Sequence, residues 1–321
     1  MSRRRRRRLR RQALSYFRLI FLLLVLFIGL PLLFAKGIRF AWEDTTNIPV
    51  VQVWNTQTNS LMKMSLEDYV KGVVAAEMPI HFDLEALKAQ AVAARTYAYQ
   101  RIIKDERISD HPEAHLSTDY RSGQAWVSSD QLRNRWGLFT YYFNKHKVDR
   151  AVDETRGVIA TYQGQPILAV YHSTSGGRTE NSEHYWSTAL PYLRSVNDPY
   201  GNHSPYSYTK YTISVANFLN AMGIEQLGQV KVVERYPSGR VKTLEAGNQW
   251  FSGREVRERL GLRSTWFTVD LNNNNLEFNL WGYGHGVGMS QYGADGMAKQ
   301  GYDYRQILQY YYQDISLHQA Y

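Results

Sequence analysis

The stretch Val73-Val-Ala-Ala-Glu-Met-Pro79 ends an apolar run with a carboxylate that stands two residues before a proline. Ser65 can cap a helix that begins after it, with Asp68 three residues later as a capping-box partner. The apolar residues that recur at helical spacing are Leu66, Tyr69, Val70, Val73 and Val74. Because Pro79 cannot continue the helix, the sequence predicts that Glu77 lies in its last turn.

A carboxylate in apolar surroundings has a distinct chemistry. Desolvation disfavours its charged form and raises its pKa, which produces a general acid that works near neutral pH. The alternative is structural, because a glutamate at a helix end is commonly half exposed or paired with an arginine. Glu77 is therefore a candidate catalytic residue with a structural alternative.

The segment that follows predicts a second helix, with Asp83 as its candidate cap. Its apolar stripe consists of Leu84, Leu87, Ala91, Ala94, Ala98 and Ile102. Lys88, Arg95 and Tyr99 line up on another face. Since the turn between the two helices is short, Lys88 or Arg95 could reach Glu77. Either cation would lower the pKa of the carboxylate and oppose the effect of burial, and the sequence leaves that balance open.

The net charge of +9 is concentrated at the N-terminus. No acidic residue precedes Glu43, and subtracting the nine arginines of the tail from +9 leaves the remainder of the chain formally neutral. These nine are Arg3 to Arg8, Arg10, Arg11 and Arg18. The excess of basic residues is thus confined to an N-terminal tail and does not indicate a basic binding groove in the domain. This argues against a nucleic-acid-binding domain.

Residues Leu19 to Ala35 are apolar throughout, and with Ala13 to Phe17 they reach about the 20 residues that span a bilayer. The rival interpretation is a cleaved signal peptide, but Leu33 occupies a position where a cleavage site needs a small residue. We therefore expect an uncleaved, single-pass anchor at 19–35. The positive-inside rule places the basic tail 1–18 in the cytoplasm and the later chain outside it.

The chain contains no cysteine. An exported domain without disulfides suits a bacterial cell-surface protein better than a small secreted eukaryotic one. After a linker at 36–47, we expect one large domain at 48–315.

Helical and strand patterns mix along that domain without a βαβ rhythm, which predicts the α+β class, as one intertwined domain with a protruding lobe. The predicted strands are 48–53, 61–64, 158–162, 166–172, 211–215, 230–236, 240–245, 266–271 and 276–281. Short helices are predicted near 130–136 and 148–155. Residues 104–130 have no clear periodicity and read as a long loop.

Two segments concentrate polar side chains and glycines. Tyr171-His-Ser-Thr-Ser-Gly-Gly177 suits a loop whose backbone approaches a polar ligand, although a plain polar turn is an equal alternative. His172 and Ser173 could form a nucleophile pair, but adjacent residues at a strand end point to opposite faces. Gly282 to Gly293 holds His285 in a glycine-rich turn that resembles a phosphate loop only superficially, because it lacks the Lys-Ser/Thr ending.

His111 and His115 are four residues apart, a spacing that binds metals on a helix. Pro112 stands between them and argues against a regular helix. Solvated loop histidines are the favoured interpretation.

Five motifs in the same order resemble the stage II sporulation protein D family, also called the SpoIID/LytB family. They are Val73-Val-Ala-Ala-Glu-Met-Pro79, Lys88-Ala-Gln-Ala-Val-Ala-Ala-Arg-Thr-Tyr97, Tyr171-His-Ser-Thr-Ser-Gly-Gly177, Gly284-His-Gly-Val-Gly-Met-Ser-Gln-Tyr-Gly293 and Ile307-Leu-Gln-Tyr-Tyr311. The resemblance covers about residues 48 to 315. Each motif alone is weak, and their common order makes the resemblance specific.

The resemblance implies a lytic transglycosylase of endospore formation. Such enzymes cleave the bond between N-acetylmuramic acid and N-acetylglucosamine in peptidoglycan strands already stripped of stem peptides, and leave 1,6-anhydro-muramic ends. It places the catalytic acid on Glu77. It assigns Lys88, Arg95, Tyr171, Ser173, Ser175 and His285 to substrate binding and positioning.

The resemblance also implies a setting and partners. The protein would work from the engulfing mother-cell membrane on the septal wall, with stage II sporulation proteins P, an amidase, and M. Some relatives hold zinc through two cysteines in the loop that here spans about 111–124. With no cysteine that site is absent, and we expect no metal or other cofactor.

Two other functions remain open. Related domains are described as enhancers of N-acetylmuramoyl-L-alanine amidases, so the domain could bind peptidoglycan without cleaving it. A membrane-tethered hydrolase that uses His172 and Ser173 is the remoter alternative.

Overall fold

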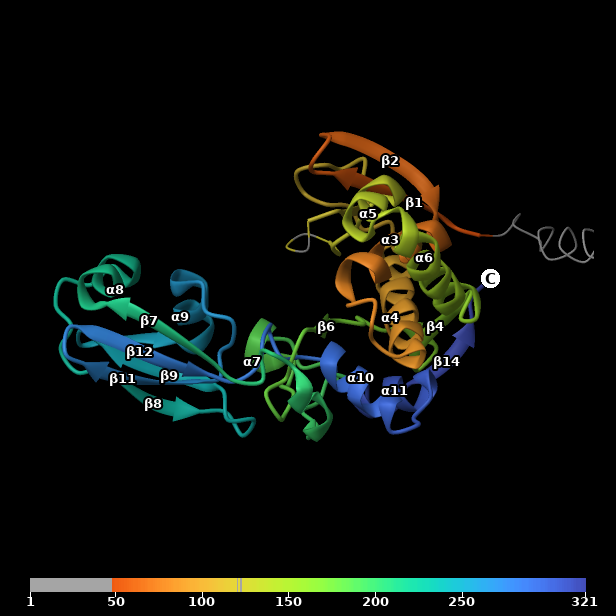
Figure 1. Cartoon of the computed structure of the whole chain (residues 1–321). Helices are drawn as coiled ribbons and strands as arrows, with labels where there is room; N and C mark the ends of the chain where they lie inside the picture. The colour runs from red at the N-terminus through yellow and green to blue at the C-terminus, as the bar shows by residue number, and fades with distance from the viewer. Residues whose placement is uncertain (1–47, 120, 122) are drawn as a thin grey trace, which may run out of the picture. The chain divides into compact units, whose positions relative to one another are not determined.

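A computed structural model of the chain describes residues 48–119, 121 and 123–321, of which 49–321 form one compact unit (Figure 1). The predicted basic tail, anchor and linker lie outside the described residues. Within the described part of the chain, no helix is both long and apolar enough to cross a bilayer.

Helix α3 (Leu66–Glu77) has the bounds that the sequence predicts. The Ser65 hydroxyl accepts a hydrogen bond from the Asp68 backbone N–H at 3.1 Å, which satisfies one free donor of the first turn. Helix α4 (Leu84–Ile103) begins after Asp83, whose carboxylate accepts from the Glu85 N–H at 2.9 Å. Both caps confirm the predicted helix starts.

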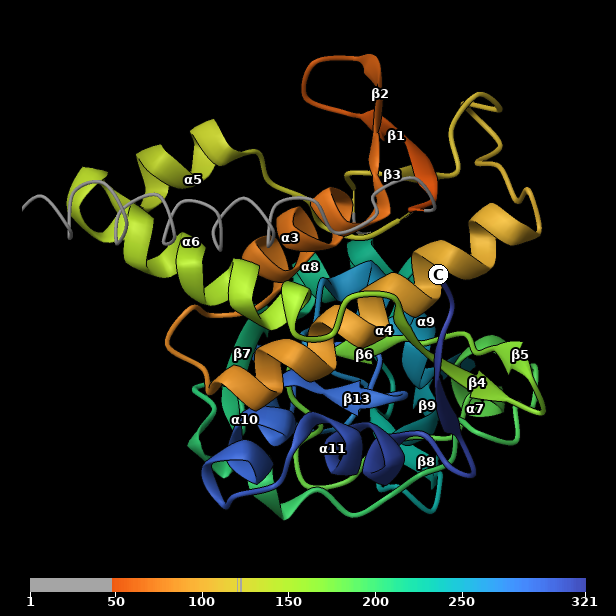
Figure 2. The ribbon, with the colours of Figure 1, turned by 90° about the vertical axis from the view of Figure 1, so that its right-hand side faces the viewer.

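Helix α4 is the central helix of this part of the fold (Figure 2). It packs against α3, α6 (Leu138–Asp153), α10 (Gln291–Lys299), α11 (Tyr304–Tyr311) and strand β4 (Val158–Tyr162). Its fully buried alanines let neighbouring backbones approach from several sides: Ala86, Ala89, Ala91, Ala93, Ala94 and Ala98. Buried residues occur nearly all round α4, as is typical of a core helix. The single apolar stripe that the sequence predicts therefore describes only part of its buried surface.

The strands form small sheets. Strand β1 (Val50–Asn55) pairs antiparallel with β2 (Ser60–Ser65) and parallel with β3 (Leu116–Ser117), which lies inside the predicted 104–130 loop. Strand β4 pairs antiparallel with β5 (Gln165–Pro166) and with β14 (Ser316–Gln319).

The predicted strand at 166–172 is corrected. It breaks after Pro166, and its last two residues form β6 (Tyr171–His172), which pairs parallel with β13 (Met289–Ser290). Pro166 lacks a backbone N–H for the ladder, so the hairpin with β4 stays short. The new partner of β6 comes from the glycine-rich segment more than a hundred residues later.

Residues 209–280 form a second core. One sheet has the order β11 (Phe267–Asn272), β12 (Asn275–Leu280), β7 (Thr209–Ser214). The other has the order β10 (Gln249–Ser252), β9 (Val241–Ala246), β8 (Lys231–Arg235). Helices α8 (Val215–Met222) and α9 (Gly253–Leu260) complete this part. Phe218, Phe267 and Phe278 are fully buried in it, so it has an apolar core of its own.

The helical content between residues 128 and 155 is larger than predicted. Helix α5 (Ser129–Trp136) agrees with the prediction, but α6 begins ten residues before the predicted Val148. The early residues of α6 show no core-facing period because several of its apolar side chains are exposed. The remaining short helices are α7 (Glu183–Trp186) and the 3₁₀ helix η3 (Pro199–His203). Mixed helices and mainly antiparallel sheets confirm the α+β class.

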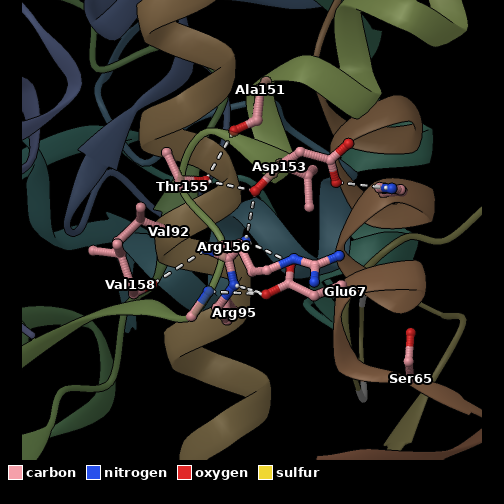
Figure 3. A network of polar contacts seen from close by, with 12 residues as sticks. Ser65, Glu67, Val92, Arg95, Ala151, Asp153, Thr155, Arg156 and Val158 are labelled. Carbon is pink, nitrogen blue, oxygen red and sulfur yellow. Dashed lines mark hydrogen bonds and ion pairs between the residues drawn. The ribbon is translucent and has the colours of Figure 1, made fainter. Parts of the chain in front are cut away.

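A buried ion pair joins α3 to α4 (Figure 3). Arg95 Nε and Nη2 donate to the two carboxylate oxygens of Glu67 at 2.9 and 2.7 Å. The guanidinium is fully buried and also donates to the carbonyls of Val152 and Val158 at 3.3 and 3.2 Å. The Tyr321 hydroxyl donates to Glu67 as well, at 2.6 Å. The pair therefore ties two helices to the end of α6, to β4 and to the C-terminus.

Loss of the Glu67 carboxylate should be strongly destabilising. Glu67→Ala leaves Arg95 charged and buried, at an expected cost of about 3–5 kcal/mol in the free energy of unfolding. The double variant Glu67→Leu/Arg95→Met should lose far less, because no charge remains buried alone. Denaturant unfolding of the three proteins measures both values. A double variant less stable than Glu67→Ala would contradict this account of the pair.

Candidate active site

Glu77 is the last residue of α3, and a few neutral polar groups contact its carboxylate. Oε1 accepts a hydrogen bond from the Ala125 backbone N–H at 3.0 Å. The hydroxyl of Tyr171 also bonds the carboxylate, and the side-chain amide of Gln291 lies near it. Burial raises the pKa of Glu77, and these three donors lower it; burial prevails, so the pKa lies above its ordinary value. The helix C-terminus, with its free carbonyls, also disfavours a negative charge there.

Tyr171 belongs to a chain of neutral side chains that ends on Glu77. Tyr69 donates to Gln124 Oε1 at 3.2 Å, and Gln124 Nε2 donates to the Tyr171 hydroxyl at 2.9 Å. The Tyr171 proton is thereby directed at Glu77. Burial, followed by the nearby Glu77 charge, raises the pKa of Tyr171 well above its usual range, so the phenol keeps its proton.

The β6–β13 ladder brings two sequence-distant groups to Glu77. Met289 pairs with Tyr171 and Ser290 with His172, so Gln291 follows directly after β13 as the first residue of α10. The Gln291 side chain is buried, and its Nε2 has no hydrogen bond of good geometry although it affects the Glu77 carboxylate. Sequence reasoning quoted this motif but did not single out Gln291. The sequence feature that could have identified Gln291 is a polar side chain at the start of a helix.

His285 supports Tyr171 from behind. Its Nδ1 accepts from the Val287 N–H at 3.1 Å, so the proton is on Nε2, which bonds the Tyr171 backbone carbonyl. Its ring packs against Trp186, with centroids 4.9 Å apart, and against Tyr185 at 5.6 Å. Burial, with the nearby Arg257 charge, lowers the pKa of His285 to about 3. The ring is therefore a neutral positioning group.

A glycine permits the close approach of the two loops. Gly284 has φ 112°, and a Cβ there would lie 2.8 Å from the Cβ of His172. Thr174 and Tyr283 exchange backbone hydrogen bonds of 3.0 and 2.8 Å, which bind the loops together. Gly284 thus allows one loop to pack closely on the other.

The predicted serines occupy different positions in this loop. Ser175 is buried and structural, because its hydroxyl accepts from the Gly177 N–H at 3.1 Å and Arg240 donates to its carbonyl at 2.8 Å. Ser173 is half-buried, and its hydroxyl lies 3.3 Å from that of Thr174. Its carbonyl accepts from the Tyr292 N–H at 3.0 Å. Ser173 is the more accessible of the two.

The geometry does not favour a Ser-His nucleophile. His172 is buried, and its Nδ1 lies 3.1 Å from the carbonyl oxygen of Val287. Burial and the neighbouring His285 lower its pKa well below the usual value. Ser173 contacts Thr174 instead of this imidazole. The two side chains therefore do not form an activated pair.

Lys88 and Arg95 have partners other than Glu77. Lys88 lies 2.6 Å from Glu85 and 2.6 Å from Glu154, and Arg95 pairs with Glu67 as described. The contact with Glu77 that the sequence left open is therefore not formed by either cation, and neither opposes the raised pKa of Glu77. Because Arg95 is fully buried, we also revise its role from substrate binding to support of α3. A role of Lys88 in binding stays a prediction.

The two loop histidines have structural contacts. The His115 Nδ1 accepts from the Gln52 backbone N–H at 3.1 Å, and His111 stacks on Trp54 with ring centroids 3.6 Å apart. In the part of the chain that the structure describes, no group of three or more His, Asp or Glu side chains is placed to hold a metal ion.

A cavity of about 280 Å³ is lined by residues of α3 and of the segments beside it. Its lining includes Gly72, Trp126, Trp136 and Lys145, and it does not include Glu77. Gly72 is required there because a Cβ would lie 2.0 Å from the indole nitrogen of Trp126. Since Trp126 follows Ala125, the packing of this indole helps to fix the N–H that Glu77 accepts.

Comparison with known proteins places the chain among relatives that share most of its length. The stage II sporulation protein D of Bacillus amyloliquefaciens is 41% identical over 281 residues, which are 87% of this chain and 80% of the relative. The protein of the same name from Bacillus subtilis is 40% identical over 290 residues, 89% of this chain and 83% of the relative. The chain belongs to the stage II sporulation protein D family.

Two further matches define the extent of the similarity. The sequence model of the stage II sporulation protein family (SpoIID) matches residues 54–162, a range that contains Glu77 but ends before Tyr171. The amidase enhancer of Bacillus subtilis is 27% identical over 305 residues, 77% of this chain and 40% of that protein. The SpoIID match alone therefore misses the glycine-rich half of the site.

His285 should remain neutral under mildly acidic conditions. Its folded pKa of about 3 lies below the ordinary value of 6.5, so its contribution to stability is complete above pH 6.5 and is lost as the pH falls toward 3. Nitrogen NMR of the imidazole at pH 5 should show the neutral Nε2–H tautomer. A protonated ring at pH 5 would contradict the buried positioning role.

Proposed function

We propose that this SpoIID protein is a lytic transglycosylase that cleaves the N-acetylmuramic acid–N-acetylglucosamine bond of denuded peptidoglycan strands. The observation that carries the proposal is Glu77, a single half-buried carboxylate with a raised pKa. The groups that bond this carboxylate in the described chain are neutral, namely the Ala125 N–H, the Tyr171 hydroxyl and the Gln291 amide. A hydrolase of the usual kind needs a second carboxylate to activate water or to attack the sugar.

One carboxyl group suffices for the proposed reaction. Protonated Glu77 donates its proton to the glycosidic oxygen as the bond from that oxygen to the muramic-acid C1 breaks. The 6-hydroxyl oxygen of the same muramic acid then bonds to C1, and the Glu77 carboxylate accepts the hydroxyl proton. The sugar closes into the 1,6-anhydro form and Glu77 is again protonated, so no water is consumed.

The neighbours of Glu77 suit this cycle. Ala125 and Tyr171 hold the carboxylate in one orientation and stabilise its charged form between the two proton transfers. The Gln291 side chain is buried beside the carboxylate, where its Nε2 can donate to Glu77 or to a substrate oxygen next to the acid. We assign Gln291 to positioning of substrate and carboxylate, and Ser173, Lys88 and His285 to binding or support.

The resemblance to the family suggests the biological setting. We propose that the protein acts in engulfment during endospore formation, held by a membrane anchor at residues 19–35 with its domain outside the cytoplasm. Its proposed partners are the glycan strand and the stage II sporulation proteins P and M. The anchor proposal is supported by the apolar run and by the arginine tail.

The 27% identity to the amidase enhancer supports a second candidate function. The domain would then bind glycan and present it to an N-acetylmuramoyl-L-alanine amidase. The two functions differ in whether glycan is cleaved by the purified protein alone.

Glu77→Gln should abolish cleavage of denuded glycan, with a loss of at least about 10²-fold from removal of the acid–base group. Glu258→Gln is the matched control, because that glutamate is exposed on α9 and should leave activity unchanged. Mass spectrometry of the products identifies 1,6-anhydro ends. Anhydro products from Glu77→Gln at the wild-type rate would exclude Glu77 as the acid, and no products from the wild type would favour the binding function.

The pH–rate profile should respond to the donors around Glu77. Its basic limb reports the pKa of the acid, so for wild type it should lie above the ordinary glutamate value of 4.5. Tyr171→Phe removes a hydrogen bond that favours the charged carboxylate, so the limb should move to higher pH. Gln291→Leu should shift it in the same direction. A limb that moves to lower pH in Tyr171→Phe would contradict the proposed contact.

A further inference from the structure

The first turns of α6 expose a cluster of large apolar side chains. Leu138 is 67% exposed, Phe139 94%, Tyr142 69% and Phe143 80%. We call these four residues the α6 tip. Figure 2 shows α5 and α6 lying beside each other, with their connecting turn at the end of the pair far from α4. The α6 tip thus lies at the outer end of this helical pair, while the later turns of α6 pack in the core.

Such a cluster differs from ordinary exposed apolar residues. The other exposed large hydrophobic side chains in the described chain, such as Trp250 and Leu271, occur singly on separate elements. Four on consecutive turns of one helix leave a contiguous apolar surface in water, which in soluble proteins marks an interaction site. The core does not use these side chains, because α6 buries Tyr141, Val148, Ala151 and Val152 instead.

The charge around the tip favours an anionic partner. Between Gln131 and Val148 the chain has no Asp or Glu, and it has four Lys or Arg residues. These are Arg133, Arg135, Lys145 and Lys147. Lys147 points inward to the carbonyls of Ile80 and Phe82, and Lys145 pairs with Asp149. Arg133 remains about half exposed near Asp130 and Tyr141.

We infer that the α6 tip inserts into the interface of an anionic lipid bilayer. Aromatic and aliphatic side chains beside arginines are the pattern of interfacial helices, whose apolar face enters the acyl boundary while cations meet the headgroups. Phe139, almost wholly exposed at the start of the helix, would enter most deeply.

The length of the chain before the domain makes this contact accessible. Residues 36–47 are twelve residues long and span at most about 40 Å when extended, at ~3.5 Å per residue. If residues 19–35 form the proposed anchor, the domain cannot leave the vicinity of the membrane. A second, weaker contact then becomes effectively intramolecular. This part of the argument rests on the proposed anchor and not on catalysis by Glu77.

The contact would orient the active site. Helix α6 packs directly against α3, the helix that ends on Glu77. Insertion of the tip would therefore fix the orientation of the catalytic carboxylate relative to the membrane. An anchor at residues 19–35 would by itself supply proximity but no orientation.

The absence of cysteine allows a site-specific test. Phe139→Cys, labelled with an environment-sensitive NBD dye, gives a unique probe in the full chain reconstituted into vesicles that contain anionic phospholipid. Leu271→Cys with the same dye is the matched control, since that side chain is also exposed but lies on β11. We expect a blue-shifted emission at 139 that is quenched by spin-labelled lipid, and a water-like emission at 271.

A water-like emission at both positions would overturn the inference, and so would a shift at 139 that appears only after a protein partner is added. A second variant series tests the tip itself. With the dye at Tyr142→Cys, the changes Phe139→Asp and Phe143→Asp should remove the blue shift. Cleavage of soluble denuded glycan should stay unchanged in these variants, because the tip does not contact Glu77. Failure of cleavage in the wild type would count against the proposed function alone and leave the labelling result intact.

Discussion

The ion pair between Glu67 and Arg95 is the constraint on which the position of helix α3 depends. A guanidinium with no exposed surface cannot return to water, so its full set of donors must be met inside the protein. Glu67 supplies two acceptors, and the carbonyls of Val152 and Val158 supply others. Helix α3 is thereby held at its start, while its other end presents Glu77.

The two glutamates of α3 show how position sets the pKa of one side-chain type. Burial alone would raise the pKa of Glu67, but the Arg95 charge and the bonds from Tyr321 and Gly157 hold it below the usual value. Burial raises the pKa of Glu77, and its donors are all neutral, so they lower the pKa less than burial raises it. The first carboxylate is thus suited to a structural ion pair and the second to proton transfer.

Much of this arrangement follows from local sequence rules. The caps Ser65 and Asp83, the break at Pro79 and the helical spacing before Glu77 were sufficient to place α3 and α4. Local rules failed where the partner was distant. Both Glu67 and Glu77 are within possible reach of Arg95, and no local sequence pattern indicates that Arg95 pairs with Glu67.

The other half of the site depends on long-range pairing. The β6–β13 ladder has only two residues in each strand, too short for a strand pattern, and it joins segments more than a hundred residues apart. Gln291 reaches Glu77 only through that pairing. The start of α6 was missed for the opposite reason, because its apolar residues face outward and show no core-directed period.

The central claim is that the surroundings of Glu77 make a proton donor without a second carboxylate. It is tested most directly by carbon NMR titration of the Glu77 side-chain carboxyl in the folded protein, with Glu77→Gln to assign the resonance. The account predicts a midpoint above the ordinary glutamate value of 4.5. A midpoint at or below that value would show that the donors of Ala125, Tyr171 and Gln291 outweigh burial, and would contradict the account.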